Sequence, residues 1–273
     1  MTAHGASREA LAAARERLDA LTDATSVDAA RLAEELAAVT ALLHREAGLR
    51  RVLTDPAQPG ERKAELVQRL LGTQIGGPAA DLVSGMVRSR WSQPRDLVDA
   101  LEQLADLADL TAAQRDGTLD DVEDELFRFS RIVSSSTELR AALTDRAAST
   151  EAKAELLHRL LGGRAKPATE RLVTRLVTAP RGRSLEAGLE SLSKLAAERR
   201  HRMVAVVTSA VPLSDRQKQR LGAALAKLYG RPMHLNLDVD PTVVGGVRVQ
   251  VGDEVINGSL ADRLDEAARR MAS

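Results

Sequence analysis

The sequence predicts a mainly α-helical protein that ends in a small α/β module. Three observations lead to this fold class. Aliphatic residues recur with helical spacing over about the first 200 residues, a long segment repeats at a fixed offset, and apolar residues alternate with polar ones from about residue 203 onward. We therefore expect two tandem, duplicated helical bundles over residues 1–110 and 111–202. A strand-helix-strand-strand-strand-helix domain should follow over residues 203–273.

The repeat is clearest between residues 53–72 and 143–162, which align without a gap at an offset of 90. Thirteen of these twenty positions are identical, against about two expected from composition alone. The same offset relates two helical stripes of apolar residues: Leu32, Leu36, Val39 and Leu43 in the first copy, and Val122, Leu126, Phe129 and Val133 in the second. We interpret the repeat as a duplication.

Turn and helix-breaking residues divide each copy into about five helical segments. They lie at residues 55–56, 72, 76–78 and 93–94 in the first copy, and at 134–136, 162–163, 167 and 180–182 in the second. Thr118 with Asp121 forms a variant of the capping box, which predicts a helix start, and Thr150 with Lys153 nearby marks another.

The period of the apolar pattern changes to two in the last part of the chain. Residues 203–209 indicate a buried strand, and Ser214 with Gln217 forms a capping box for a helix that ends near Tyr229. Residues 233–239 and 247–251 alternate as strands, and the latter connects to residues 254–256 through a two-residue hairpin turn. A final helix is expected over residues 260–271.

Composition excludes several classes of function. The 39 Lys and Arg balance 39 Asp and Glu, so no net charge attracts nucleic acid or an anionic membrane. The absence of Cys excludes disulfides, thiol catalysis and thiolate metal sites, and two Phe, one Tyr and one Trp are too few for base-stacking platforms. No window reaches the ~18–20 apolar residues of a membrane-spanning helix. The first ten residues are polar, so we expect no secretion signal either.

No group of residues indicates catalysis or metal binding. Gly245-Gly246 precedes a predicted strand rather than a helix, so we interpret the pair as a tight turn or bulge that needs a positive φ, not as a phosphate loop. Asp253 and Glu254 are adjacent on a strand or its turn and point to opposite faces. The five His residues have no metal-ligand spacing. We expect no enzymatic activity, no cofactor and no metal.

A cluster of basic residues in the first copy has a counterpart in the second. They are Arg88, Arg90 and Arg95 in the first copy and Arg175, Arg181 and Arg183 in the second. Three interpretations stay open: solvated helix ends, contacts with an acidic protein segment, and a nucleic-acid surface. Trp91 lies at a bend between helices, where it either packs the end of the bundle or anchors an interface. The candidate interface residues are Trp91, Arg90, Leu172 and Leu176.

The C-terminal residues resemble a known signature. Residues 209–214 read Ser-Ala-Val-Pro-Leu-Ser, and residues 240–259 contain Asp-Pro, a glycine pair, alternating strand residues and Gly-Ser at matching spacing. The signature positions are Asp240, Pro241, Gly245, Gly246, Gly252, Asp253, Gly258 and Ser259. This pattern is similar to the delta subunit family of F-type ATP synthases, whose mitochondrial member is the oligomycin sensitivity-conferring protein. The upstream Leu-Thr-Asp, Lys-Ala-Glu-Leu and Leu-Leu-Gly segments resemble the family's helical domain.

Two features depart from the family pattern. Asn257 stands where the family usually has Asp before Gly-Ser, which places any role of a charge there in doubt but keeps the turn geometry. The second helical copy is absent from typical members, and it resembles a longer, duplicated form found in GC-rich bacteria.

The resemblance implies a non-catalytic stator in the peripheral stalk. In that family the helical domain binds the N-termini of alpha subunits in the catalytic head, and the C-terminal domain binds the C-termini of the membrane-anchored b subunits. We expect this chain to couple rotation to ATP synthesis and proton transport in the same way, with residues 111–202 in contact with the head. It would then be a peripheral membrane protein at the cytoplasmic face, attached indirectly through the complex and without nucleic acid. The alternative is a helical adaptor that binds nucleic acid or a cytosolic protein through its Arg clusters.

Overall fold

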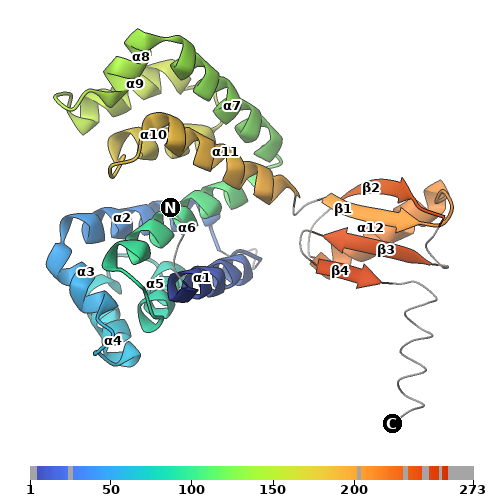
Figure 1. Ribbon diagram of the computed structural model, residues 1–273, viewed down its shortest axis with the longest axis horizontal. Coiled ribbons are helices and arrows are strands. Elements are labelled where there is room, and N and C mark those ends of the chain that lie inside the picture. Colours follow the sequence, from blue (N-terminus) through green and yellow to red (C-terminus); the bar gives the residue numbers. More distant parts are fainter. Residues whose placement is uncertain are drawn as a thin grey trace. The chain divides into compact units, whose positions relative to one another are not determined.

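The computed structural model describes residues 5–23, 27–201, 204–229, 233–241, 246–251 and 254–257. Within these ranges the chain is mostly helical and has a four-stranded sheet near its C-terminus, so the predicted fold class, mainly α with a C-terminal α/β module, is confirmed (Figure 1). The chain divides into two compact units, Met1–Ala196 and Ala197–Ser273.

The first unit is built from helices joined by short turns. The first six helices are α1 (Gly5–Asp23), α2 (Ala29–Arg45), α3 (Ala47–Thr54), α4 (Gly60–Leu71), α5 (Gly77–Arg88) and α6 (Pro94–Arg115). The next five are α7 (Leu119–Ser135), α8 (Thr137–Thr144), α9 (Thr150–Leu161), α10 (Pro167–Thr178) and α11 (Leu185–His201). The bounds of α2, α3, α4 and α5 reappear unchanged at an offset of 90 as those of α7, α8, α9 and α10. Helix α6 extends across the predicted boundary at residue 110.

Polar side chains cap several of the helices. Asp28 caps α2 by accepting hydrogen bonds from the backbone of Ala30 and Arg31, and Ser149 caps α9 by accepting one from Ala152. Thr118 precedes α7 as predicted, but its hydroxyl donates to the Ala113 carbonyl and makes no cap hydrogen bond. The expected capping box at Thr118 is therefore wrong, because the hydroxyl bonds to a carbonyl of α6 instead.

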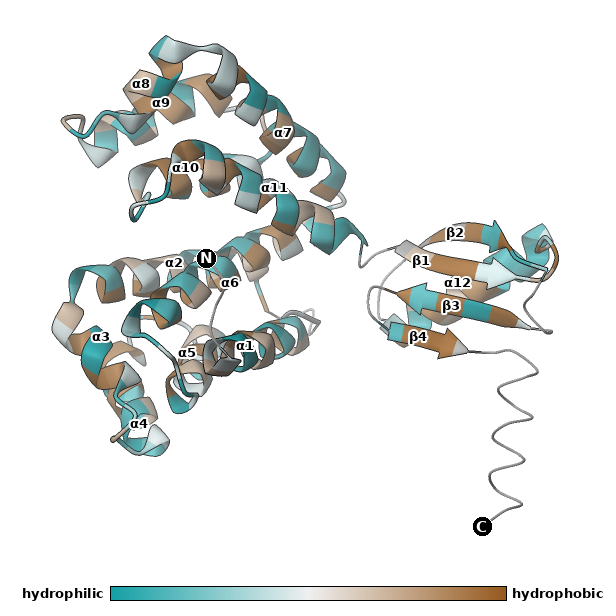
Figure 2. Ribbon diagram, viewed as in Figure 1, coloured by the Kyte–Doolittle hydropathy of each residue, from teal (hydrophilic) through white to brown (hydrophobic). Residues whose placement is uncertain are grey.

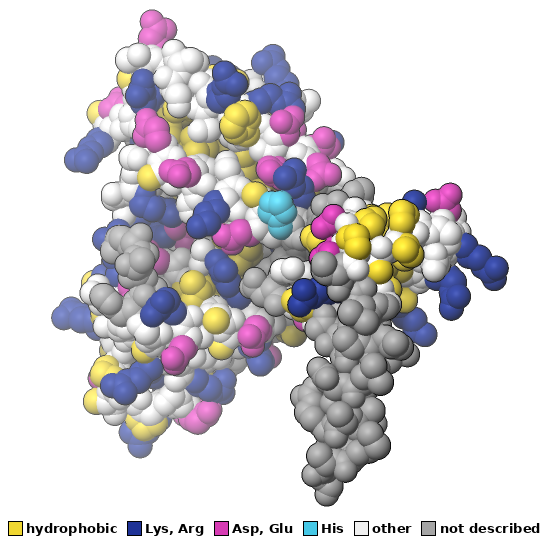
Figure 3. All heavy atoms as spheres, turned by 45° about the vertical axis from the view of Figure 1, so that its right-hand side comes forward, with side chains coloured by type: hydrophobic (Ala, Val, Ile, Leu, Met, Phe, Trp, Pro, Cys, Tyr) yellow, Lys and Arg dark blue, Asp and Glu magenta, His cyan; other side chains and the backbone are white. Residues whose placement is uncertain are grey.

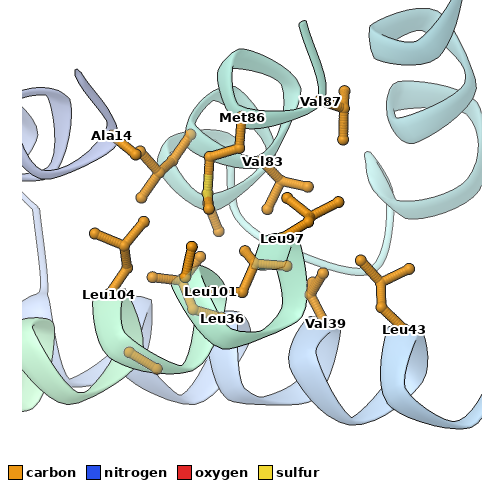
Figure 4. Close-up of a cluster of buried hydrophobic side chains, with 14 of the residues drawn as sticks. Ala14, Leu36, Val39, Leu43, Val83, Met86, Val87, Leu97, Leu101 and Leu104 are labelled. Atoms are coloured by element: carbon orange, nitrogen blue, oxygen red, sulfur yellow. The ribbon is translucent and has the colours of Figure 1, made fainter. Parts of the chain in front are cut away.

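Aliphatic side chains form the core of the first six helices. Helix α2 packs along α6 and α4 packs along α5, and α1 contacts both α5 and α6. Figure 4 shows α2, α5 and α6 directing apolar side chains at one another. These residues are Leu36, Val39, Leu43, Val83, Met86, Val87, Leu97, Leu101 and Leu104, with Ala14 from α1. In Figure 2 hydrophobic and hydrophilic segments alternate along these helices, as expected of helices with one apolar face.

Helices α10 and α11 approach closely at a glycine. A Cβ atom at Gly188 would overlap the Leu176 Cδ1 atom, and Leu176 itself is buried. The absence of a side chain at Gly188 is therefore what lets α11 lie against α10 at this point.

The second unit contains a mixed sheet and one described helix. Its elements are β1 (Val204–Ser209), α12 (Asp215–Tyr229), β2 (His234–Val239), β3 (Val247–Val251) and β4 (Glu254–Asn257). The strand order is β2-β1-β3-β4, with β1 parallel to β2 and antiparallel to β3, and β3 antiparallel to β4. These elements agree with the sequence expectations to within one residue. The final helix expected over residues 260–271 lies outside the described residues.

One face of the sheet builds the small core of this unit. Its buried side chains are Ala205, Val207, Val249 and Val251 from the sheet and Leu225 from α12. The predicted capping box at the start of α12 is confirmed. The Gln217 side-chain oxygen accepts from the Ser214 backbone at 2.9 Å, and the Ser214 hydroxyl accepts from the Gln217 backbone at 3.4 Å. Tyr229, at the end of α12, donates from its hydroxyl to Glu254 on β4 at 2.8 Å.

The close approach at Gly188 leads to a testable prediction. Gly188→Ala should destabilise the chain by about 1–3 kcal/mol, because the new methyl group overlaps a buried leucine. Urea unfolding followed by circular dichroism measures the change. Gly48→Ala is the matched control, since Gly48 is also helical but a methyl group there would meet no neighbouring atom within 4 Å. The control should be neutral or stabilising by up to about 1 kcal/mol. Equal effects of the two substitutions would contradict the packing account.

Candidate functional site

Described residues of the C-terminal signature lie at the ends of strands. Asp240 follows β2, and its backbone N–H donates to the Ser209 carbonyl at the end of β1. Pro241 is exposed in the turn that follows. Gly246 has φ +88 directly before β3, which confirms at this position the positive φ expected of the glycine pair. The signature residues Gly245, Gly252, Asp253, Gly258 and Ser259 lie outside the described residues.

Three of the four candidate interface residues are buried within the chain. Trp91 is 7% exposed, and its indole N–H donates to the Met86 carbonyl at 2.8 Å. Leu172 and Leu176 lie on the buried face of α10, whereas Arg90 is exposed. A partner contact at any of these positions stays a prediction.

The most distinctive arrangement in the first unit is a buried ladder of ion pairs between α6 and the segment from α10 to α11. Four carboxylates on α6, which we call the carboxylate stripe, are Asp99, Glu102, Asp106 and Asp109. Their spacing of three, four and three residues places them on one face of the helix. The arginines that they meet are Arg171, Arg175, Arg181 and Arg183.

The ion pairs of this ladder have short nitrogen–oxygen distances, and most of their side chains are shielded from water. Arg171 Nε lies 2.6 Å from Asp109 Oδ1, and Arg175 Nη1 lies 2.7 Å from Asp106 Oδ1 while its other terminal nitrogen pairs with Asp109. The Asp109 side chain is 0% exposed. Breaking a buried pair of this kind from one side costs about 3–5 kcal/mol, because the remaining charge stays buried without a partner.

The turn between α10 and α11 supplies the other rungs. Arg181 Nη1 lies 2.7 Å from Asp99 Oδ1, its second terminal nitrogen pairs with Glu102, and Arg183 lies 2.7 Å from Glu102. Arg181 has φ +48, a left-handed conformation that non-glycine residues rarely adopt. Its carbonyl accepts a hydrogen bond from Arg95 at 2.7 Å, so backbone and side chain of this turn are both held on α6.

Burial raises the pKa of Asp106 to about 7. The charges of Glu102 and Asp109 raise it further, and Arg175 opposes them without outweighing the loss of hydration. Arg175 in turn keeps a raised pKa, because the charges of Asp106 and Asp109 outweigh its own desolvation. The charge of Asp106 therefore changes near neutral pH.

The ladder decides between the interpretations of the second Arg cluster. Arg175, Arg181 and Arg183 each pair with a carboxylate of α6, so they contact an acidic protein segment, and that segment belongs to the same chain. They are therefore not an open basic surface. In the first copy Arg88 pairs with Glu61, with its Nε 2.9 Å from the carboxylate.

Large apolar side chains are exposed in both units, among them one pair on α7 and one pair on the sheet. In the first unit, Phe127 and Ile132 on α7 are 56% and 52% exposed. In the second unit, Val206 and Val255 are exposed on the sheet face opposite the core, with Gln250 between them in the paired register. Figure 3 shows hydrophobic side chains gathered on the C-terminal unit, while basic and acidic side chains are interspersed over the helical unit. Exposed apolar surface of this kind is typical of protein-protein contacts.

The described residues contain no group of three or more His, Cys, Asp or Glu that could hold a metal ion. An open depression of about 460 Å³ is lined by Glu61, Ala64, Glu65, Gln68, Arg69 and Arg88. A cavity beside Asp106 has a volume of about 10 Å³, roughly that of one water probe. None of the described helices is both long enough and apolar enough to cross a membrane.

Comparison with known proteins identifies the family. A family model described as ATP synthase delta (OSCP) subunit matches residues 107–271, more than half of the chain. The chain belongs to the ATP synthase delta (OSCP) family. The ATP synthase subunit delta of Streptomyces coelicolor is 82% identical over 270 residues, which cover 99% of this chain and 98% of the relative. That of Thermobifida fusca is 50% identical over 268 residues, which cover 98% and 99% of the two chains.

The chain is a non-catalytic, peripheral-stalk subunit of an F-type ATP synthase. The comparisons give no support to the alternative of a nucleic-acid-binding adaptor. A chain in the mitochondrial ATP synthase hexamer of Toxoplasma gondii aligns with 62% of this chain and 97% of its own length. Its identity is 21% and its TM-score 0.33, a value too low for an argument about the fold.

The raised pKa of Asp106 predicts how stability depends on pH. Because the folded-state pKa of about 7 exceeds the unfolded value, the folded chain binds more protons between these values. The contribution of Asp106 to the free energy of unfolding should therefore fall as the pH rises from about 4 through 7, and level off above about 8. Asp106→Asn should flatten this decrease.

Urea midpoints at a series of pH values measure the effect. His158, whose pKa is raised by Glu170, contributes a decrease of the same sign, so the informative quantity is the difference between Asp106→Asn and the unmodified chain. His158→Gln serves as the matched control for the histidine contribution. The same pH profile for Asp106→Asn and the unmodified chain would show that Asp106 does not titrate in this window.

Proposed function

We propose that the chain joins the catalytic head of the synthase to its membrane-anchored b subunits at the cytoplasmic face of the membrane. In this proposal residues 111–202 bind N-terminal segments of the alpha subunits, and residues 203–273 bind the C-termini of the b subunits. Its attachment to the membrane is then indirect, through the complex. The head is thereby kept from turning with the rotor, which couples rotation to ATP synthesis.

The family match is the observation that supports this division of labour most. It covers residues 107–271, which include the second set of helices and the C-terminal unit but not the first five helices. The parts common to the family are therefore those to which we assign the two contacts. Each of them also exposes apolar side chains, Phe127 and Ile132 in one and Val206 and Val255 in the other.

We also infer that the two sets of helices are duplicated bundles. The support comes from thirteen identities in twenty aligned residues and from the unchanged bounds of four successive helices at the same offset of 90. In this interpretation the first bundle is an addition that lengthens or stiffens the stalk.

Reconstitution tests the stator function. Synthase membranes stripped of this subunit should hydrolyse ATP without pumping protons, and adding the purified chain should restore pumping at an unchanged rate of hydrolysis. Proton uptake into vesicles and phosphate release, measured in parallel, give the number of protons pumped per ATP hydrolysed. Pumping that does not depend on the chain would overturn the proposal.

Photo-crosslinking tests the assignment of the head contact. A synthetic peptide with the N-terminal sequence of the alpha subunit, bearing a photoreactive group, should crosslink to residues 111–202 of the full chain. Peptide mapping by mass spectrometry locates the product, and a scrambled peptide is the control. Crosslinks confined to residues 1–110 would show that the first bundle, and not the second, contacts the head.

A further inference from the structure

Helix α6 occupies two positions in the repeat. Helix α1, Gly5–Asp23, shifted by 90 becomes residues 95–113, which lie inside α6. Helix α6, Pro94–Arg115, shifted by 90 becomes residues 184–205, which include α11. The numbering therefore makes α6 both the sixth helix of the first set and the first helix of the second.

We propose that α6 is shared by the two bundles, and that its carboxylate stripe positions the second bundle on it. The residues so assigned are positioning residues: Asp99, Glu102, Asp106 and Asp109 on α6, and the arginines of the ladder opposite them. The proposal goes beyond the stator function, because it concerns how the added bundle is joined to the one common to the family.

Each of two opposite faces of α6 packs against one of the two bundles. Leu97, Leu101, Leu104 and Ala108, at spacings of four, three and four, lie on one face and belong to the core of the first bundle. The carboxylate stripe lies on the opposite face and meets α10 and its following turn. Both faces are buried, so α6 lies between the bundles rather than at the edge of either.

One position on the fifth helix of each bundle is acidic in the first bundle and basic in the second. In the first bundle Arg17 on α1 pairs with Asp81 on α5 at 2.8 Å. Shifted by 90, Asp81 corresponds to Arg171, which pairs with Asp109 of α6. The basic partner has thus moved from the first helix of the bundle to the fifth.

At a second position the second bundle has an arginine where the first bundle has no side chain. Gly85 on α5 has no side chain, and Arg17 Cδ lies 3.6 Å from where its Cβ would be. The equivalent residue on α10 is Arg175, which reaches Asp106 and Asp109.

A shared helix removes the linker between the bundles. Two domains joined by a flexible linker move independently, whereas two bundles that pack on opposite faces of one helix move as one body. The ladder should therefore fix the distance between them.

Distance measurement between nitroxide spin labels tests the proposal on the full chain. The chain has no Cys, so Arg62→Cys on α4 and Ala152→Cys on α9 give two unique, exposed and equivalent label sites. Double electron-electron resonance should give one narrow distance distribution. Adding Arg171→Gln and Arg175→Gln should replace it with a broad one, because two buried carboxylates lose their partners.

Rescue and control variants separate positioning from general loss of stability. Asp106→Asn and Asp109→Asn, added to the two Arg→Gln substitutions, should restore a narrow distribution because they remove the unpaired buried charges. Arg17→Gln is the matched control and should leave the distribution narrow, since Arg17 and Asp81 are each about half exposed. Fluorescence of Trp91, the single Trp and a residue of the first core, should stay native throughout.

Two results would overturn the proposal: a broad distribution in the unmodified chain, or a narrow one that survives Arg171→Gln with Arg175→Gln. If that double variant does not fold, Arg183→Gln removes a more exposed rung and gives the same comparison. These distances are measured on the free chain, so their outcome is independent of whether the chain binds the head and the b subunits as proposed.

Discussion

The buried ladder between α6 and α10 is the interaction on which the rest of the helical unit depends. Taking Glu102, Asp106 and Asp109 out of water is costly, and the arginines opposite them offset that cost. The arrangement is therefore selective: an apolar face would accept many packing partners, whereas this face accepts a helix that presents arginines at matching positions. Burial of Asp106 is deep enough to raise its pKa to about 7.

This constraint suits a peripheral-stalk subunit. A stator has to resist rotation, so the parts of a stalk subunit should not move relative to one another. The helical unit satisfies that need by packing two sets of helices against one, while Gly188 lets α11 lie close on α10. The C-terminal unit has a small core of its own and leaves Val206 and Val255 exposed on the other face of its sheet. We assign contacts with neighbouring subunits to such exposed surfaces and rigidity to the ladder.

Much of the fold could be predicted from the sequence, and the ladder could not. Apolar periodicity and turn residues placed the strands, and the Ser214 and Gln217 pair located the start of α12, because these signals are local. The acids at residues 99, 102, 106 and 109 have the spacing of an ordinary solvated helix face. Their partners lie about 60 to 80 residues further along, and no local rule links the two. The family signature indicated the function but gave no information on this contact.

Native-state hydrogen exchange of the full chain tests the central claim most directly, because it reports how strongly each helix is held. If α6 is the shared support of both bundles, its amides from Leu97 to Ala113 should be among the slowest to exchange in the helical unit, along both halves of the helix. Exchange of the second half, residues 106–113, as fast as that of the exposed helix α8 would contradict the account. It would mean that α6 belongs to the first bundle alone.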